Sequence, residues 1–167
     1  MLKQLKFNKK HNSGFTLIEL AVTLAIAGVL MYYAIPAYSD FSQRQALTNE
    51  TNDLLSDLGF ARSLAIENGS RVTVTSVSGD KDWSDGWNIR ETLANGNLNI
   101  VRSKIELPNN VTIEASESTV SYSGLGALST PITVTFNIEI DPDFLNFLAV
   151  NVLPSGLASS NRDAYAN

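Results

Sequence analysis

The sequence contains no cysteine, and its only histidine is His11. The missing thiols exclude disulfide bonds, thiolate nucleophiles and cysteine-ligated metal centres. A Ser-His-Asp triad needs a histidine, and none follows residue 11. The composition therefore favours a protein that is not an enzyme, and we expect no metal and no other cofactor.

Positive charge is also scarce outside the N-terminus. Four lysines cluster near the start, with no acidic residue among them: Lys3, Lys6, Lys9 and Lys10. The other eight of the twelve basic residues face seventeen acidic ones, which gives a net charge of −9 from Phe15 onward. Such an acidic surface repels phosphate backbones, so the composition disfavours nucleic-acid binding.

One apolar run, Phe15–Tyr38, is long enough to span a membrane and contains a single charged residue, Glu19. As a helix it covers roughly 36 Å, more than the ~30 Å hydrocarbon core, and the preceding lysines predict a cytoplasmic N-terminus. A cleaved signal peptide would have an apolar core of only about 7–15 residues. An uncleaved anchor fits the length but does not explain the carboxylate, which costs about 2.5–3.5 kcal/mol at the membrane centre.

A second helical pattern runs from Ser39 to Asn68. Its apolar residues recur in steps of three and four, which defines one helix face, and Asn68-Gly69 supplies a stop signal. The residues of this face are Leu47, Leu54, Leu55, Leu58, Ala61, Leu64 and Ala65. Pro36 lacks an amide donor, so we expect a kink near Met31–Tyr33.

Alternation with a period of two replaces the helical spacing after Gly69. Residues 71–78 alternate, and Asn95-Gly96 predicts a hairpin within residues 87–105. Further short strands are predicted at 110–116, 118–124, 132–140 and 147–156. The pattern indicates an α+β fold, in which a long N-terminal helix, transmembrane in its first half, packs on an antiparallel β-sheet domain.

The loop that contains both tryptophans allows two ligand hypotheses beside a structural one. Trp83 and Trp87 could form a ligand platform, although such a pair more often packs in the core. Asp80 and Glu91 have the spacing of a calcium loop, but Asp85 occupies the position where that loop needs glycine. A solvated loop with a packed tryptophan pair is the simpler interpretation.

The stretch SGFTLIELAVTLAIAGVL, which begins at Ser13, resembles the N-terminus of type IV prepilins and pseudopilins. The resemblance implies that a prepilin peptidase cleaves between Gly14 and Phe15 and that Phe15 is then N-methylated. It implies that Glu19 pairs with the N-terminal amine of a neighbouring subunit, so that the carboxylate sets register during assembly. Pro36 matches the proline at which pilin helices commonly bend.

This resemblance divides the chain into three parts. Residues 1–14 are the leader, residues 15–38 the transmembrane and assembly helix, and residues 39–167 the globular domain with the second half of the helix. The expected partners are the prepilin peptidase, other major and minor pilins, and the inner-membrane assembly platform. The expected location is a single pass in the inner membrane with a periplasmic globular domain, or the pilus tip or shaft after assembly.

Four later motifs are similar to those of GspH/FimT-type minor pilins: ARSLAIENGSRVTV, DWSDGW, YSGLG and PSG. The resemblance implies a structural or initiation subunit of a type IV pilus. A type II secretion pseudopilin and a DNA-binding uptake pilin remain alternatives. Uptake pilins of this type carry an arginine-rich tail, whereas this chain has Leu157 and only Arg162 in that region.

Overall fold

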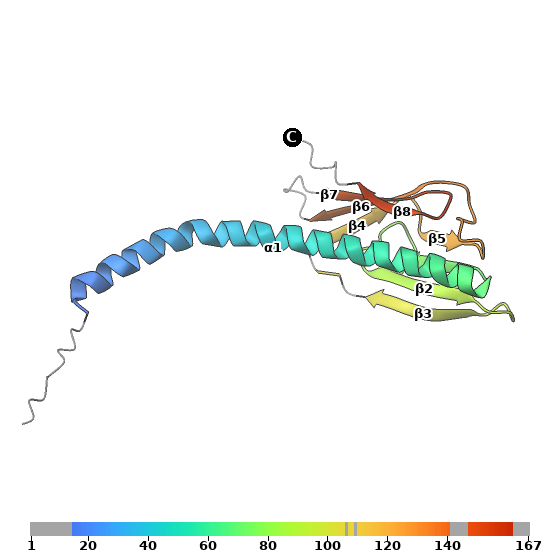
Figure 1. Cartoon of the computed structure of the whole chain (residues 1–167), viewed down its shortest axis with the longest axis horizontal. Coiled ribbons are helices and arrows are strands. Elements are labelled where there is room, and N and C mark those ends of the chain that lie inside the picture. The colour runs from blue at the N-terminus through green and yellow to red at the C-terminus, as the bar shows by residue number, and fades with distance from the viewer. Residues whose placement is uncertain (1–14, 106, 109, 141–146, 162–167) are drawn as a thin grey trace, which may run out of the picture. The chain divides into compact units, whose positions relative to one another are not determined.

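The computed structural model describes residues 15–105, 107, 108, 110–140 and 147–161. The chain forms two compact units, Met1–Asp40 and Phe41–Asn167, and the helix α1 (Leu17–Asn68) contributes to both (Figure 1). In the first unit, α1 continues through Pro36, so the proline does not end the helix. The kink near Met31–Tyr33 stays a prediction.

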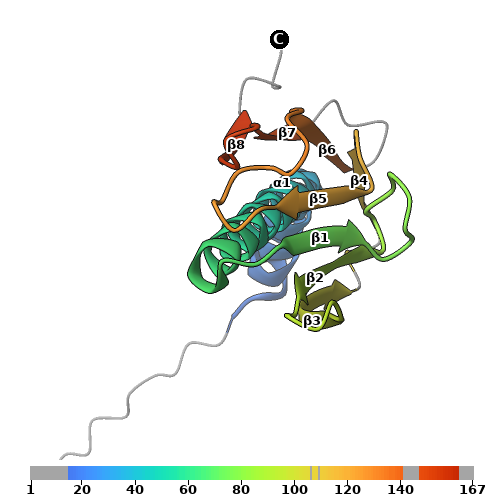
Figure 2. The same cartoon turned by 90° about the vertical axis from the view of Figure 1, so that its right-hand side faces the viewer.

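In the described part of the second unit, eight antiparallel strands form two four-stranded sheets. The first sheet has the order β3-β2-β1-β5 and the second the order β4-β6-β7-β8. The strands are β1 (Val72–Ser76), β2 (Gly86–Thr92), β3 (Leu98–Ile105), β4 (Val111–Ala115), β5 (Thr119–Tyr122), β6 (Val134–Ile140), β7 (Phe147–Val152) and β8 (Ala158–Asn161). Figure 2 shows both sheets around the second half of α1, with β3 and β8 at opposite ends. The predicted α+β fold is confirmed.

The segment between β1 and β2 joins the two sheets. The Trp83 amide donates to the Ile113 carbonyl at 2.7 Å, and the Ala115 amide donates to the Lys81 carbonyl at 2.8 Å. The Trp83 ring also meets Phe136 edge-to-face, with centroids 4.8 Å apart. Because these contacts connect the first sheet to β4 and β6, the two sheets share one core with α1.

The predicted apolar face of the second half of α1 is confirmed. Its leucines and alanines are buried or packed against the core. The helix ends at Asn68, and Gly69 follows with a φ of 58°, which L-residues with a side chain rarely adopt. The Ser70 amide donates to the Ala65 carbonyl and the Gly69 amide to the Ile66 carbonyl, which is the Schellman arrangement that satisfies the last carbonyls.

The hairpin around Asn95-Gly96 is confirmed, since β2 and β3 pair from Gly86↔Ile105 to Thr92↔Leu98.

Strand β8 was not predicted. Its sequence, Ala-Ser-Ser-Asn, is short, polar and largely exposed, so it carries no alternation. Pairing with β7 defines it instead. The division of the strands into two sheets also has no signal in the local pattern, because it depends on long-range pairing.

Candidate functional site

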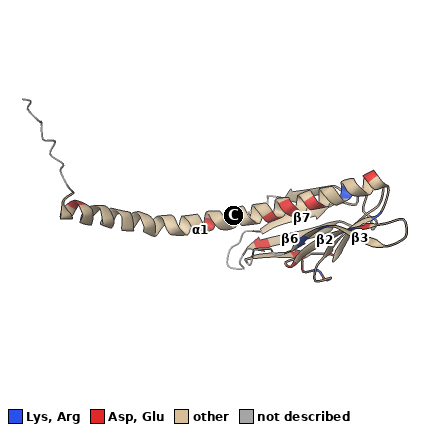
Figure 3. Cartoon of the chain, turned by 90° about the horizontal axis from the view of Figure 1, so that it is seen from below, with Lys and Arg blue, Asp and Glu red and all other residues tan. Residues whose placement is uncertain are grey.

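The first half of α1 presents an apolar surface that no other described part of the chain covers. Every large apolar side chain from Phe15 to Tyr38 is between 49% and 89% exposed. Figure 3 shows this part of α1 almost without charge after its first turn, whereas acidic residues recur along the second half. Among the described residues, α1 alone is long and apolar enough to cross a membrane. Such a surface needs lipid or other helices around it.

Glu19 caps the start of this helix within its own chain. One carboxylate oxygen, Oε2, accepts hydrogen bonds from the Thr16 amide and the Thr16 hydroxyl, both at 2.9 Å. The Glu19 amide donates in return to the Thr16 hydroxyl at 3.3 Å. This is a capping box, in which two side chains satisfy amides that the first helical turn leaves free. Oε1 accepts no hydrogen bond within the described part of the chain, so it stays available to a further donor.

The predicted assembly residues therefore fall at one end and in the interior of the exposed segment. Phe15 is 89% exposed directly before α1, and Glu19 lies in its first turn. Pro36 lies inside the helix. Gly14, the leader and the four N-terminal lysines lie outside the described residues. The capping box was not predicted, although the Thr-x-x-Glu spacing that makes it is present in the sequence.

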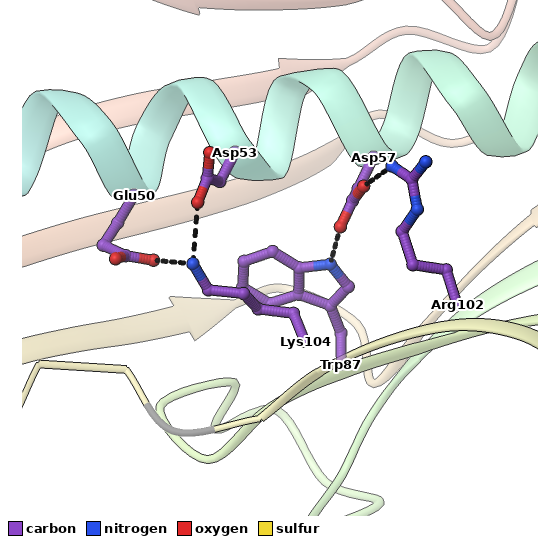
Figure 4. A network of polar contacts seen from close by, with 6 residues as sticks. All are labelled: Glu50, Asp53, Asp57, Trp87, Arg102 and Lys104. Atoms are coloured by element: carbon purple, nitrogen blue, oxygen red, sulfur yellow. Dashed lines mark hydrogen bonds and ion pairs between the residues drawn. The ribbon is translucent and has the colours of Figure 1, made fainter.

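The second half of α1 carries a buried carboxylate that binds two strands. Asp57 is 7% exposed. It accepts a hydrogen bond from Trp87 Nε1 at 2.8 Å, and its other oxygen accepts one from the Arg102 guanidinium at 2.6 Å (Figure 4). The Arg102 guanidinium also lies 4.1 Å from the centre of the Phe60 ring. One carboxylate thus joins α1 to both β2 and β3.

Lys104 makes two further ion pairs with the two preceding turns of the same helix face. Lys104 Nζ lies 2.7 Å from Asp53 Oδ2 and 3.2 Å from Glu50 Oε2 (Figure 4). Both basic residues come from β3, which buries none of its side chains fully. Three ion pairs, and not the burial of apolar side chains of β3, therefore connect β3 to α1. We name these five charged residues the α1–β3 clamp: Glu50, Asp53, Asp57, Arg102 and Lys104.

The clamp was not predicted, although the sequence contains a signal for it. Glu50, Asp53 and Asp57 are spaced by three and four residues, so they share a helix face beside the leucine face. Buried acidic residues need partners, and Arg102 and Lys104 alternate on the predicted strand with the period that puts them on one side. The pairing of these two sets depends on the tertiary fold, which local patterns do not contain.

Lys104 gives the clamp a dependence on alkaline pH. Burial lowers the pKa of Lys104, but its contacts with Asp53 and Glu50 outweigh burial and raise that pKa above the usual 10.5. A group whose pKa is raised by folding stabilises the folded state at pH values below its pKa in the unfolded state. This stabilisation is lost as the pH rises through its pKa in the folded state.

We therefore expect Lys104→Met to reduce the free energy of unfolding at pH 8. The difference from the wild type should shrink once the pH exceeds about 10.5. Urea titrations of both proteins at pH 8 and pH 11 check this. Lys81→Met, at an exposed lysine, is the matched control. A difference that stays constant across this range would contradict the role of Lys104 charge.

The tryptophan loop behaves as the structural interpretation predicts. Trp83 and Trp87 are fully buried, so they form core and not a ligand platform. Asp80, Asp82 and Asp85 are exposed. In the described part of the chain, no group of three or more acidic or histidine side chains is arranged to hold a metal ion.

Comparisons with known proteins agree with this geometry. Residues 50–156 match the family described as Type II transport protein GspH, and residues 9–31 match the prokaryotic N-terminal methylation motif. The chain is 31% identical over 128 residues to a fimbrial protein of Pseudomonas aeruginosa. The aligned region covers 75% of this chain and 80% of that protein.

Two solved structures have a similar fold. The type IV minor pilin FimU of Pseudomonas aeruginosa gives a TM-score of 0.60 at 21% identity, over 75% of this chain and 99% of that one. The minor pseudopilin EpsH from the type 2 secretion system of Vibrio cholerae gives a TM-score of 0.53 at 11% identity, over 69% of this chain and 95% of that one. At these identities the likeness concerns the fold.

Proposed function

The chain belongs to the GspH family of pilins and pseudopilins, which are structural subunits and not enzymes. On this premise, we propose that it is a minor pilin that helps to initiate a type IV pilus. The observation that carries the proposal is the exposed apolar first half of α1, which begins beside Phe15 and Glu19. Members of this family assemble with other pilins, and such a surface is suited to a helix bundle.

Processing precedes assembly in this proposal. A prepilin peptidase removes residues 1–14, and the new N-terminus at Phe15 is methylated. The methylation motif that matches residues 9–31 supports this assignment. Phe15, the residue that would become the new N-terminus, is exposed and precedes the first helical residue, Leu17.

Assembly then uses both oxygens of Glu19. Oε2 remains bound to Thr16, while Oε1 accepts the amine of a neighbouring subunit's N-terminus. The capping box holds the carboxylate at the helix start before the neighbour arrives, so little rearrangement is needed on docking. A charge buried without a partner is costly, so the pair favours one register of the two helices. Pro36 removes one helical hydrogen bond and allows the helix to bend in the bundle.

The expected topology follows from charge and length. Residues 15–38 cross the inner membrane once, the lysine-rich leader lies in the cytoplasm, and the globular domain from residue 39 onward lies in the periplasm. The inner-membrane assembly platform then transfers the subunit into a filament, where it takes a position at the tip or in the shaft.

A type II secretion pseudopilin is the second candidate, and the fold shared with EpsH supports it. The identity to a fimbrial protein favours the pilus. DNA uptake has less support, because two basic residues of the globular domain, Arg102 and Lys104, are already paired with carboxylates of α1. Leu157 is apolar and 55% exposed, and Arg162 lies outside the described residues.

Leader processing is tested by Gly14→Val. We expect this variant to accumulate as an uncleaved, membrane-held precursor, because a branched side chain does not fit a cleavage site that accepts glycine. The measurement is migration on a denaturing gel, in cells with and without the prepilin peptidase. Gly28→Val, at an open position within α1, is the control and should be processed. A Gly14→Val chain of mature size would show that cleavage occurs elsewhere.

A further inference from the structure

Two turns of the globular domain lie against each other beside the last turns of α1. The first is residues 123–127, where the Gly126 amide donates to the Ser123 carbonyl at 2.8 Å. The second is residues 153–157, which connects β7 to β8. The Leu128 amide donates to the Pro154 carbonyl at 3.0 Å and so links the two turns.

The contact between these turns is too close for any side chain. Gly126 and Gly156 have φ values of 77° and 82°. A Cβ atom on Gly156 would lie 1.9 Å from the Gly126 carbonyl oxygen, and one on Gly126 would lie 2.5 Å from Ile66 Cδ1. Arg62 Nε donates to the same Gly126 carbonyl at 2.8 Å. The turns are therefore held rigidly to each other and to α1.

This rigid base carries four exposed aliphatic side chains. Leu125 is 89% exposed, Leu157 55%, Ile66 47% and Leu153 45%. Neither turn contains a charged residue, although the chain from Phe41 onward has fifteen acidic and eight basic residues. Exposed apolar groups that are clustered and preorganised mark interaction sites, because binding loses little conformational entropy there. We name these four residues the leucine platform.

We propose that the leucine platform binds the globular domain of a different pilin-class subunit anchored in the same membrane; this rests on the proposed function. A patch of this kind covers on the order of a few hundred Å², whereas a stable interface buries about 800 Å² on each partner. The platform alone is thus too small to hold a free partner. Two subunits fixed side by side by their membrane helices have a high effective concentration, which makes a small contact sufficient.

Charge argues against a second copy of this chain as the occupant. Two globular domains that each carry a net charge of −7 from residue 41 onward repel each other. A subunit with an apolar patch and a less acidic domain avoids this repulsion. The platform is then a contact that selects which pilin lies next to this one.

The absence of cysteine makes a site-specific test possible. Leu125→Cys in the full chain, in cells that make the complete set of pilins, is labelled with a thiol-directed photo-crosslinker. The matched control is Leu93→Cys. Leu93 is 41% exposed and opens the turn 93–97, which has the same hydrogen bonds as the turn 153–157. A third probe, Leu24→Cys in the apolar helix, reports assembly itself.

We expect Leu125→Cys to give an adduct with another pilin-class subunit, identified by mass spectrometry, at a yield about tenfold or more above Leu93→Cys. Adding Leu157→Asp should reduce the Leu125→Cys adduct by a similar factor, as for loss of a hot spot, whereas adding Leu93→Asp should not. Equal yields from Leu125→Cys and Leu93→Cys, a lipid adduct, or an adduct of this chain with itself would overturn the proposal. A Leu24→Cys adduct without a Leu125→Cys adduct overturns the platform alone, and loss of both overturns the proposed function as well.

Discussion

Asp57→Ala is expected to lower the free energy of unfolding of the globular unit by about 2–3 kcal/mol. Asp57 is 7% exposed and accepts hydrogen bonds from Trp87 Nε1 and the Arg102 guanidinium. Its removal leaves the indole N–H buried without an acceptor. Arg102 is 46% exposed and regains water, so the cost stays below that of a fully buried ion pair. Urea unfolding at pH 7, followed by tryptophan fluorescence, measures the change.

The chain provides its own control in Asp53→Ala. Asp53 is 54% exposed at its side chain, and its partner Lys104 keeps Glu50 when Asp53 is lost. We expect a change of about 0–1 kcal/mol, as for an exposed ion pair. The measurement uses a truncated chain that starts at Ser39. This truncation keeps the described buried core residues, which lie between Leu47 and Val152. Equal effects of Asp53→Ala and Asp57→Ala would show that burial of the carboxylate does not determine how much each clamp residue contributes to the free energy of unfolding.

The elements that the sequence predicts best are those with a strong local period. The apolar face of α1, the stop at Gly69 and the hairpin around Asn95-Gly96 are each indicated by residues that lie a few positions apart in the sequence. Strand β8 and the separation of two sheets depend on pairing across the fold, and Ala158–Asn161 carries no alternation that would indicate it. The missed elements of the fold are therefore the long-range ones, whereas the capping box of Thr16 and Glu19 was missed although it is a local pattern.

The same distinction holds for the sites. Glu19 stands out because a carboxylate is costly in an apolar run, and this cost is visible in sequence. The clamp and the leucine platform are combinations of side chains from distant segments. Leu125 and Leu157 belong to two turns that are far apart in the sequence, and the close approach of Gly126 to Gly156 places these turns side by side.

Glu19→Ala is expected to spare leader cleavage and membrane insertion but to abolish docking with other pilins. Insertion should become easier, because the charged group is gone. Docking should weaken by a factor of several hundred or more, since breaking a buried ion pair by removing one partner costs about 3–5 kcal/mol. The measurement is crosslinking from Leu24→Cys to neighbouring pilins, relative to the amount of this chain in the inner membrane.

The capping box supplies a control that separates helix capping from pairing between subunits. Thr16→Val removes the hydroxyl that binds Glu19 Oε2 but keeps the carboxylate, so it should cost only the cap, about 1 kcal/mol, and leave docking largely intact. If Thr16→Val and Glu19→Ala reduced crosslinking equally, Glu19 would act through the helix start and not through a neighbour's amine.

A subunit at the top of the filament has no neighbour above it, and there Glu19→Ala would be silent. The corresponding substitution in the major pilin of that cell, which has neighbours on both sides, then distinguishes a tip position from a wrong pairing hypothesis. Loss of piliation would assign this chain to the tip. Normal piliation would overturn the pairing hypothesis.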